Sequence, residues 1–181
     1  MADPTDLSND DNWNGGYYEL AIKLGAHDDE RLDAALNSLW EAAGLQQAFR
    51  RGSTGPASEL TPVVSAESLL AGSLHSVASI PGLGLTLCSV LVVREETYEA
   101  GVTRYGQDWL GLCLPLGALD NLDHRVGAYP FDETAPSRAW REPIERWFEG
   151  VARSVFEIVP FVHAVTGFEV SGVEPSEVKL G

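Results

Sequence analysis

The stretch YYELAIKLGAHDDERLDAALNSLWEAAG, residues 17–44, decides the fold class. Its first part alternates residue by residue, a period typical of a strand with one buried face; the buried set would be Tyr18, Leu20, Ile22 and Leu24. Asp28 then offers an N-cap, and apolar residues recur at helical spacing until Gly44, a natural helix end. The folded part of the chain is therefore predicted to begin with a strand, a turn and a helix.

Two segments in the middle of the chain, residues 85–94 and 108–114, are rich in Leu and Val and flank a polar stretch. We expect an antiparallel hairpin of these two strands. A turn centred on Ala100 and Gly101 would place Cys88 opposite Cys113, and it would also pair Leu91 with Leu110 and Val92 with Trp109.

The last third predicts a helix and a strand. Residues 140–159 carry an amphipathic pattern whose apolar stripe is Trp140, Ile144, Trp147, Phe148, Val151, Val155 and Ile158, with Pro143 expected in the first turn. Residues 161–170 alternate again as a strand. Between the first helix and the hairpin, residues 46–84 give mixed signals, and we interpret residues 65–79 as a helix.

The resulting order is strand, helix, strand, strand, helix, strand. This order predicts an α+β fold of the ferredoxin-like (split βαβ) type, in which two main helices cover one face of a four-stranded antiparallel sheet. We expect an acidic, loose leader over residues 1–15, a single domain over 16–171 with an insertion at 46–84, and a loose tail over 172–181.

The predicted pairing assigns side chains to the two sheet faces. The set expected to face the helices is Leu20, Ile22, Leu91, Leu110, Leu112 and Phe168. The set expected on the opposite face is Tyr17 or Glu19, Cys88, Val92, Trp109, Cys113, His163 and Glu169. An aliphatic face of this kind must be covered by the 46–84 insertion, by a second subunit or by a ligand.

Charge narrows the range of partners. The 181 residues contain 27 acidic and 12 basic side chains, a net charge of −15. Such a chain repels phosphate backbones and anionic lipid, so neither nucleic acid nor membrane is an expected partner. The first 30 residues hold eight acids and one lysine, a balance of −7, so almost half of the excess charge lies near the N-terminus.

Compartment and cofactor signals are few. The N-terminus lacks the basic and apolar parts of a secretory signal, and two cysteines are too few for a disulfide framework, so we expect a cytoplasmic protein with free thiols. The sequence around Gly82 and Gly84 lacks the rest of a phosphate-binding motif. The acidic clusters beside His27 and His124 are explained by helix capping and turns, so we expect no cofactor and no metal.

The candidate site lies on the face opposite the helices and consists of Trp109, His163, Cys113 and Glu169. A cysteine beside a histidine can act as nucleophile and base, whereas the alternative is that these groups are packed core residues. The favoured hypothesis is a non-enzymatic binding module that associates with a basic protein, similar to inhibitor or immunity proteins by analogy only. The alternatives are a ligand-binding protein or enzyme with a pocket between this face and the insertion, and a homodimer packed through the same face.

Overall fold

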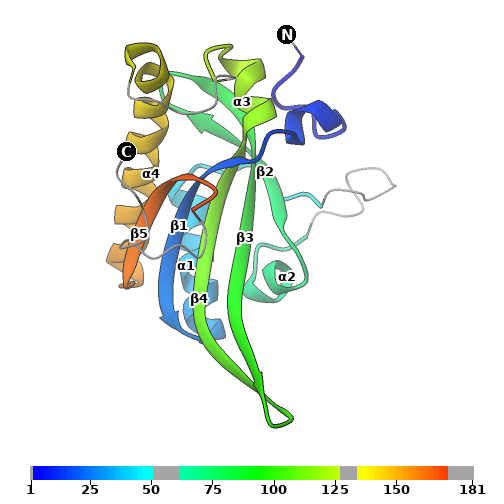
Figure 1. Ribbon diagram of the computed structural model, residues 1–181, viewed down its shortest axis with the longest axis vertical. Helices are drawn as coiled ribbons and strands as arrows, with labels where there is room; N and C mark the ends of the chain where they lie inside the picture. Colours follow the sequence, from blue (N-terminus) through cyan, green and yellow to red (C-terminus); the bar gives the residue numbers. More distant parts are fainter. Residues whose placement is uncertain (1, 51–61, 127–133, 171–181) are drawn as a thin grey trace.

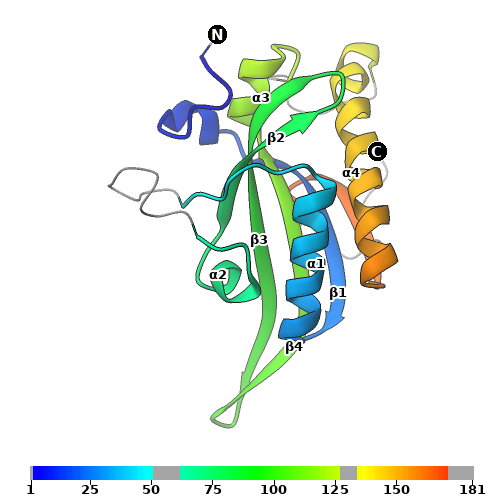
Figure 2. The ribbon, with the colours of Figure 1, turned by 180° about the vertical axis from the view of Figure 1, so that it is seen from behind.

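The computed structural model describes residues 2–50, 62–126 and 134–170. One antiparallel sheet has the order β2-β3-β4-β1-β5, and the main helices lie together on one side of it (Figures 1 and 2). The strands are β1 (Tyr17–Ala26), β2 (Leu74–Ile80), β3 (Gly84–Glu99), β4 (Val102–Pro115) and β5 (His163–Phe168). The helices are the 3-10 turn η1 (Asp10–Trp13), α1 (Asp29–Ala42), α2 (Ala66–Leu70), α3 (Leu116–Leu122) and α4 (Ala135–Ile158).

The predicted strand-turn-helix unit is confirmed as β1 and α1. The Asp28 side chain accepts a hydrogen bond from the backbone N–H of Arg31, as an N-cap does. Gly44 follows the helix with a φ of 60°, a left-handed conformation that glycine adopts without steric strain.

The main core fills the space between the sheet and the helices. Leu20 and Ile22 of β1 lie opposite Leu112 and Leu110 of β4, and all four are buried. The two long helices close this layer with Leu32, Leu36, Leu39, Trp140, Ile144 and Phe148. The prediction that both main helices cover the same sheet face is therefore confirmed.

The prediction of four strands is wrong, because the sheet has five. Residues 65–79 were expected to form a helix, but only the short α2 is helical there and β2 follows. Gly72, with a φ of 146°, separates the two elements. The buried residues of β2 then recur every second position, at Leu74, Ser76, Ala78 and Ile80. The ferredoxin-like arrangement is accordingly not confirmed as a complete description of this sheet.

The hairpin has the predicted turn and a shifted register. Ala100 and Gly101 both have positive φ, and Glu99 pairs with Val102. A bulge between Arg94 and Glu96 then moves the pairing by one residue. Such a shift exchanges the two faces of a strand.

The bulge overturns three predicted pairs. Cys113 lies opposite Ser89 and not Cys88, Leu110 lies opposite Val92, and Trp109 lies opposite Val93. Cys88 and Val92 consequently lie on the helix side with the main core, whereas Leu91 lies on the opposite face.

α4 begins earlier than predicted and is longer. Its first residues include Pro136, which the first turn of a helix tolerates. Pro143, expected in the first turn, lies inside the helix. Most of the predicted stripe is buried, but Ile158 is 66% exposed at the C-terminal end.

The N-terminal segment, residues 2–15, packs on α3. The fully buried Asn12 donates its amide N–H groups to the carbonyls of Asp3 and Asp6, and accepts a hydrogen bond from Asn121 of α3. Trp13 packs with Leu87 in a small separate cluster. That the N-terminal segment is loosely attached stays a prediction, which these contacts do not favour. The predicted loose tail at 172–181 lies outside the described residues.

Candidate functional site

The sheet face opposite the helices, called here the open face, brings two of the four predicted site residues together. Trp109 and His163 approach edge to face, with ring centroids 5.3 Å apart. Lys23 lies between them in the sheet, and its Nζ is 5.4 Å from the centre of the Trp109 ring. The Trp109 indole N–H donates to the Glu95 carboxylate at 3.3 Å. Trp109 is thus held from several sides and is only 2% exposed.

Cys113 lies on the same face of β4, two rows of side chains beyond Trp109, and is fully buried. Its thiol donates to the carboxylate of Glu19 at 3.2 Å. Burial raises the pKa of the Cys113 thiol well above its ordinary value, and the Glu19 carboxylate raises it further. Because the thiolate is the nucleophile, this arrangement disfavours covalent chemistry at Cys113.

Glu169 is not part of this group. It follows β5, where its backbone N–H donates to Tyr17 at the end of β1 opposite Lys23 and His163. Six residues of extended chain separate it from His163, a span of about 20 Å. The structure therefore does not bring Glu169 together with His163, because His163 begins β5 and Glu169 follows its other end.

The open face is partly covered, but not by the described part of the 46–84 insertion. Residues 46–49 lie along the outer edge of β2, and α2 packs into the main core on the helix side. The N-terminal segment covers Leu87, and Val170 packs on Trp109 and Ala21. Leu91 remains half-buried and Val93 is 41% exposed.

A second feature is the end of the β3–β4 hairpin, which projects beyond the helices (Figures 1 and 2). Pairing of β4 with β1 ends at Gln107, and pairing of β3 with β2 ends at Val90. Beyond these residues the hairpin is a two-stranded ribbon. Tyr98 and Val102 near its turn are 76% and 59% exposed.

Exposed carboxylates surround this ribbon. They come from the ribbon itself, from the start of α1 and from the end of α4, and they are Asp28, Asp29, Glu30, Glu95, Glu96, Glu99 and Glu157. The start of α1 is tied to the ribbon because Arg94 donates to Asp29 at 2.8 Å. The carboxylates therefore belong to one end of the molecule.

An ion pair joins the two strands of the hairpin at the base of the ribbon, where Arg94 lies opposite Asp108. Arg94 donates to both carboxylate oxygens of Asp108, at 2.8 and 2.9 Å, and the Asp108 side chain is 1% exposed. Hydrogen bonding to Asp108 is the largest cause that raises the pKa of Arg94. Such a two-pronged pair is directional, so it holds β3 and β4 together where the ribbon begins.

An apolar corner lies at the same end of the molecule, where α4 meets β5. Phe156 and Phe161 are in edge-to-face contact at 5.1 Å, and Phe156 is 49% exposed. Ile158 and Val162 beside them are 66% and 61% exposed. The hairpin ribbon, its carboxylates and this corner are together called the hairpin end.

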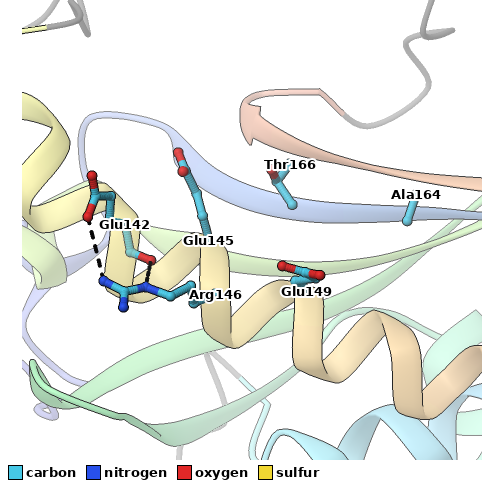
Figure 3. Close-up of a pocket in the computed structure, with 6 residues that line it drawn as sticks. All are labelled: Glu142, Glu145, Arg146, Glu149, Ala164 and Thr166. Carbon is cyan, nitrogen blue, oxygen red and sulfur yellow. Dashed lines mark hydrogen bonds and ion pairs between the residues drawn. The ribbon is translucent and has the colours of Figure 1, made fainter.

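A groove of about 470 Å³ runs between α4 and β5, and Figure 3 shows its lining. α4 contributes Glu142, Glu145, Arg146 and Glu149, and β5 contributes the small side chains of Ala164 and Thr166. Glu145 and Glu149 project from the helix toward the strands (Figure 3). Glu145 accepts a hydrogen bond of 2.6 Å from the Tyr18 hydroxyl.

Within the described ranges no cluster of three or more His, Cys, Asp or Glu side chains could hold a metal ion. None of the helices in those ranges is long and apolar enough to cross a membrane. Comparison of the chain with protein-family models, with curated proteins and with solved structures finds no match.

Sequence reasoning missed the ion pair and the groove. A charged residue ending an apolar strand, as Arg94 does after Leu91–Val93, was the available signal for a partly buried partner. The size of the groove depends on the distance between α4 and β5, and no local sequence pattern indicates that distance. Both features require the three-dimensional arrangement.

Proposed function

We propose that this protein is a binding module that associates with another protein through the hairpin end. The observation that carries the proposal is the exposure of Tyr98 and Val102, 76% and 59%, on a two-stranded ribbon that projects from the body. An isolated two-stranded ribbon is only marginally stable in water. A protein surface that packs on these side chains would stabilise the ribbon and remove apolar area from water.

The charge of the hairpin end supports a basic partner. Seven carboxylates there are exposed, and the Arg94 guanidinium beside them donates hydrogen bonds to Asp108 and Asp29. A negative electrostatic potential speeds association with a positively charged protein surface and disfavours association with a negatively charged one. Two copies of this chain would bring the same carboxylates together, so the proposal names a different protein as the partner.

The hypothesis of an enzyme or a small-molecule pocket on the open face has less support. Its proposed wall, the described part of the 46–84 insertion, lies at the β2 edge and on the helix side. Its proposed nucleophile, Cys113, is buried with a raised pKa. Two buried free thiols fit the cytoplasmic location expected from the sequence, which remains part of the proposal.

We also propose a more specific fold than a five-stranded antiparallel sheet with helices on one side. We infer that β1, α1, β3, β4, α4 and β5 form a ferredoxin-like unit and that β2 extends it at one edge. The supporting observation is the order β3-β4-β1-β5 within the sheet. In this arrangement the projecting ribbon is the end of the hairpin that connects β3 and β4, the second and third strands of the unit in chain order.

Site-specific photocrosslinking tests the proposed function. A photoreactive phenylalanine analogue replaces Tyr98 in one variant and Leu70, which is 42% exposed on α2, in a matched control, and each is expressed in the native host. We expect one discrete heterologous adduct from position 98 and none from position 70. Its yield should fall when salt rises from about 0.05 to 0.5 M, because salt screens exposed charges. Equal adducts from both positions, or an adduct with the mass of a homodimer, would contradict the proposal.

A further inference from the structure

The two edges of the sheet differ in how their backbone groups are used. At the β2 edge, His75 exchanges two backbone hydrogen bonds with Phe49, and the Val77 carbonyl accepts from Gln46. At the β5 edge, no described segment occupies the corresponding position outside Ala164 and Thr166. An uncovered edge is a template for one more strand.

The direction of the β5 backbone groups follows from the ladder. Glu169 donates its backbone N–H to Tyr17, and Val165 and Gly167 lie at even spacing from it along the strand. In an antiparallel ladder the hydrogen-bonded positions alternate. The N–H and C=O groups of Ala164 and Thr166 therefore point away from β1, toward the uncovered edge.

The groove lies directly beside these outward groups. The Ala164 and Thr166 side chains line it from the strand, and three carboxylates and one guanidinium line it from α4. Figure 3 shows the helix and the strand on its two sides. Small side chains on β5 leave the 470 Å³ open, so a strand added at this edge would direct every second side chain into it.

We propose that the β5 edge and this groove bind an extended basic segment of another protein, which adds antiparallel to β5 as a sixth strand. The spacing suits such a segment: Glu145 and Glu149 are four residues apart on the helix, about 6 Å along its axis, and alternate side chains of a strand repeat about every 7 Å. Lysine or arginine at alternate positions would reach these carboxylates. This surface differs from the hairpin end and does not depend on it.

Arginines of α4 already contact two of the carboxylates that line the groove. Glu142 lies 3.7 Å from Arg138 and 3.5 Å from Arg146, and Glu149 lies 2.6 Å from Arg153. All of these are exposed pairs one turn apart on one helix. Pairs of this kind contribute about 0.5 kcal/mol or less, so an incoming cation can share or replace them.

A fluorescent eight-residue peptide of alternating Lys and Thr is a suitable probe of the full-length chain. The first control replaces every Lys by Glu. Two further controls carry N-methyl groups, either on the Lys nitrogens or on the Thr nitrogens. In the proposed antiparallel pairing the Lys residues lie opposite Ala164 and Thr166, so the Lys N–H groups face β5 and the Thr N–H groups face water.

At low salt we expect the Lys peptide to bind at least about tenfold more tightly than the Glu peptide. Methylation of the Lys nitrogens should weaken binding by about tenfold, and methylation of the Thr nitrogens by less than about twofold. Amide hydrogen exchange at Ala164 and Thr166 should slow when the peptide binds. In the protein, Glu149→Lys should weaken binding at least about fivefold, while Glu41→Lys, at an exposed position of α1 that does not line the groove, should change it by less than about twofold.

Three results would overturn the proposal. The first is equal binding of both N-methylated peptides, which would indicate adhesion by charge alone. The second is protection of Ala164 and Thr166 in the free protein together with a dimer in sedimentation, which would make a second copy the occupant of the edge. The third is no binding of the Lys peptide, at about millimolar concentration, to the unmodified chain.

Discussion

Replacement of Asp108 by Asn should destabilise the protein by about 3 kcal/mol. The Asp108 carboxylate is 1% exposed and accepts two hydrogen bonds from Arg94, at 2.8 and 2.9 Å. A hydrogen bond to a charged group contributes about 1.5–3 kcal/mol, and breaking a buried ion pair costs about 3–5 kcal/mol. Because Arg94 keeps Asp29 at 2.8 Å, we place the change at the lower end of that range.

Urea unfolding followed by tryptophan fluorescence measures this change, with a thermal melt beside it. A loss of about 3 kcal/mol corresponds to a Tm lower by roughly 6–12 °C in a chain of this size. The matched control is Asp29→Asn, which removes a carboxylate that also contacts Arg94 but is 61% exposed, and it should cost about 1 kcal/mol or less. Equal losses in the two variants would refute the argument that burial makes Asp108 the stronger partner.

Three further outcomes follow from the buried groups and the glycines. Burial raises the pKa of Cys88 to about 12 and also raises that of Cys113, so a disulfide reagent at about pH 8 should label neither thiol until urea unfolds the chain; rapid native labelling of either would contradict this. Burial, then the Glu145 carboxylate, raises the pKa of the Tyr18 hydroxyl above 10.0, so the folded state holds this proton more tightly than the unfolded state and stability is lost as pH rises above about 10. Tyr18→Phe should therefore lose less stability at alkaline pH, as measured by urea unfolding at a series of pH values. Identical pH dependence in the two proteins would contradict this. A Cβ at position 117 would overlap the Asp11 carbonyl, so Gly117→Ala should make the N-terminal segment accessible to limited proteolysis. In the control Gly150→Ala the new Cβ meets nothing within 4 Å, and the substitution should stabilise α4 by about 0.5–1 kcal/mol. Unchanged cleavage of Gly117→Ala would show that the segment is not held there.

The best-predicted parts of the fold are those whose signals are local. The strand at β1, the Asp28 cap and the Ala100–Gly101 turn each depend on neighbours in sequence, and each is confirmed, although Tyr18 to Ile22 are buried without the expected alternation. A helix covering one sheet face follows from an amphipathic stripe in the same way. Local chemistry therefore accounts for the existence of most elements.

The wrong predictions arise where a single residue shifts the register of a strand or ends a helix. The bulge beside Glu95 inserts a single residue and moves Cys88 and Leu91 to the faces opposite those predicted. Leucines near residue 70 happen to recur at helical spacing although Gly72 ends the helix and β2 follows. Neither effect has a compositional signature strong enough to override the pattern around it.

Which of the candidate site residues lie together depends on how the strands pair, and the sequence does not show this pairing. Trp109 and His163 were correctly expected on one face, because each has a clear period of two around it. Glu169 was assigned to the same group although its strand carries it to the other end of the sheet. The groove beside β5 depends on the docking of α4, which only the packed core determines.

The most direct test of the central claim is a comparison of the photocrosslinked partner's affinity for two purified variants. Tyr98→Ser changes a ribbon side chain that is 76% exposed, and Leu70→Ser changes an exposed leucine on α2. Our account predicts that Tyr98→Ser weakens the complex by at least about tenfold at unchanged Tm, and that Leu70→Ser leaves the affinity within about twofold. Equal affinities of the two variants would contradict the claim that the hairpin end is the binding surface.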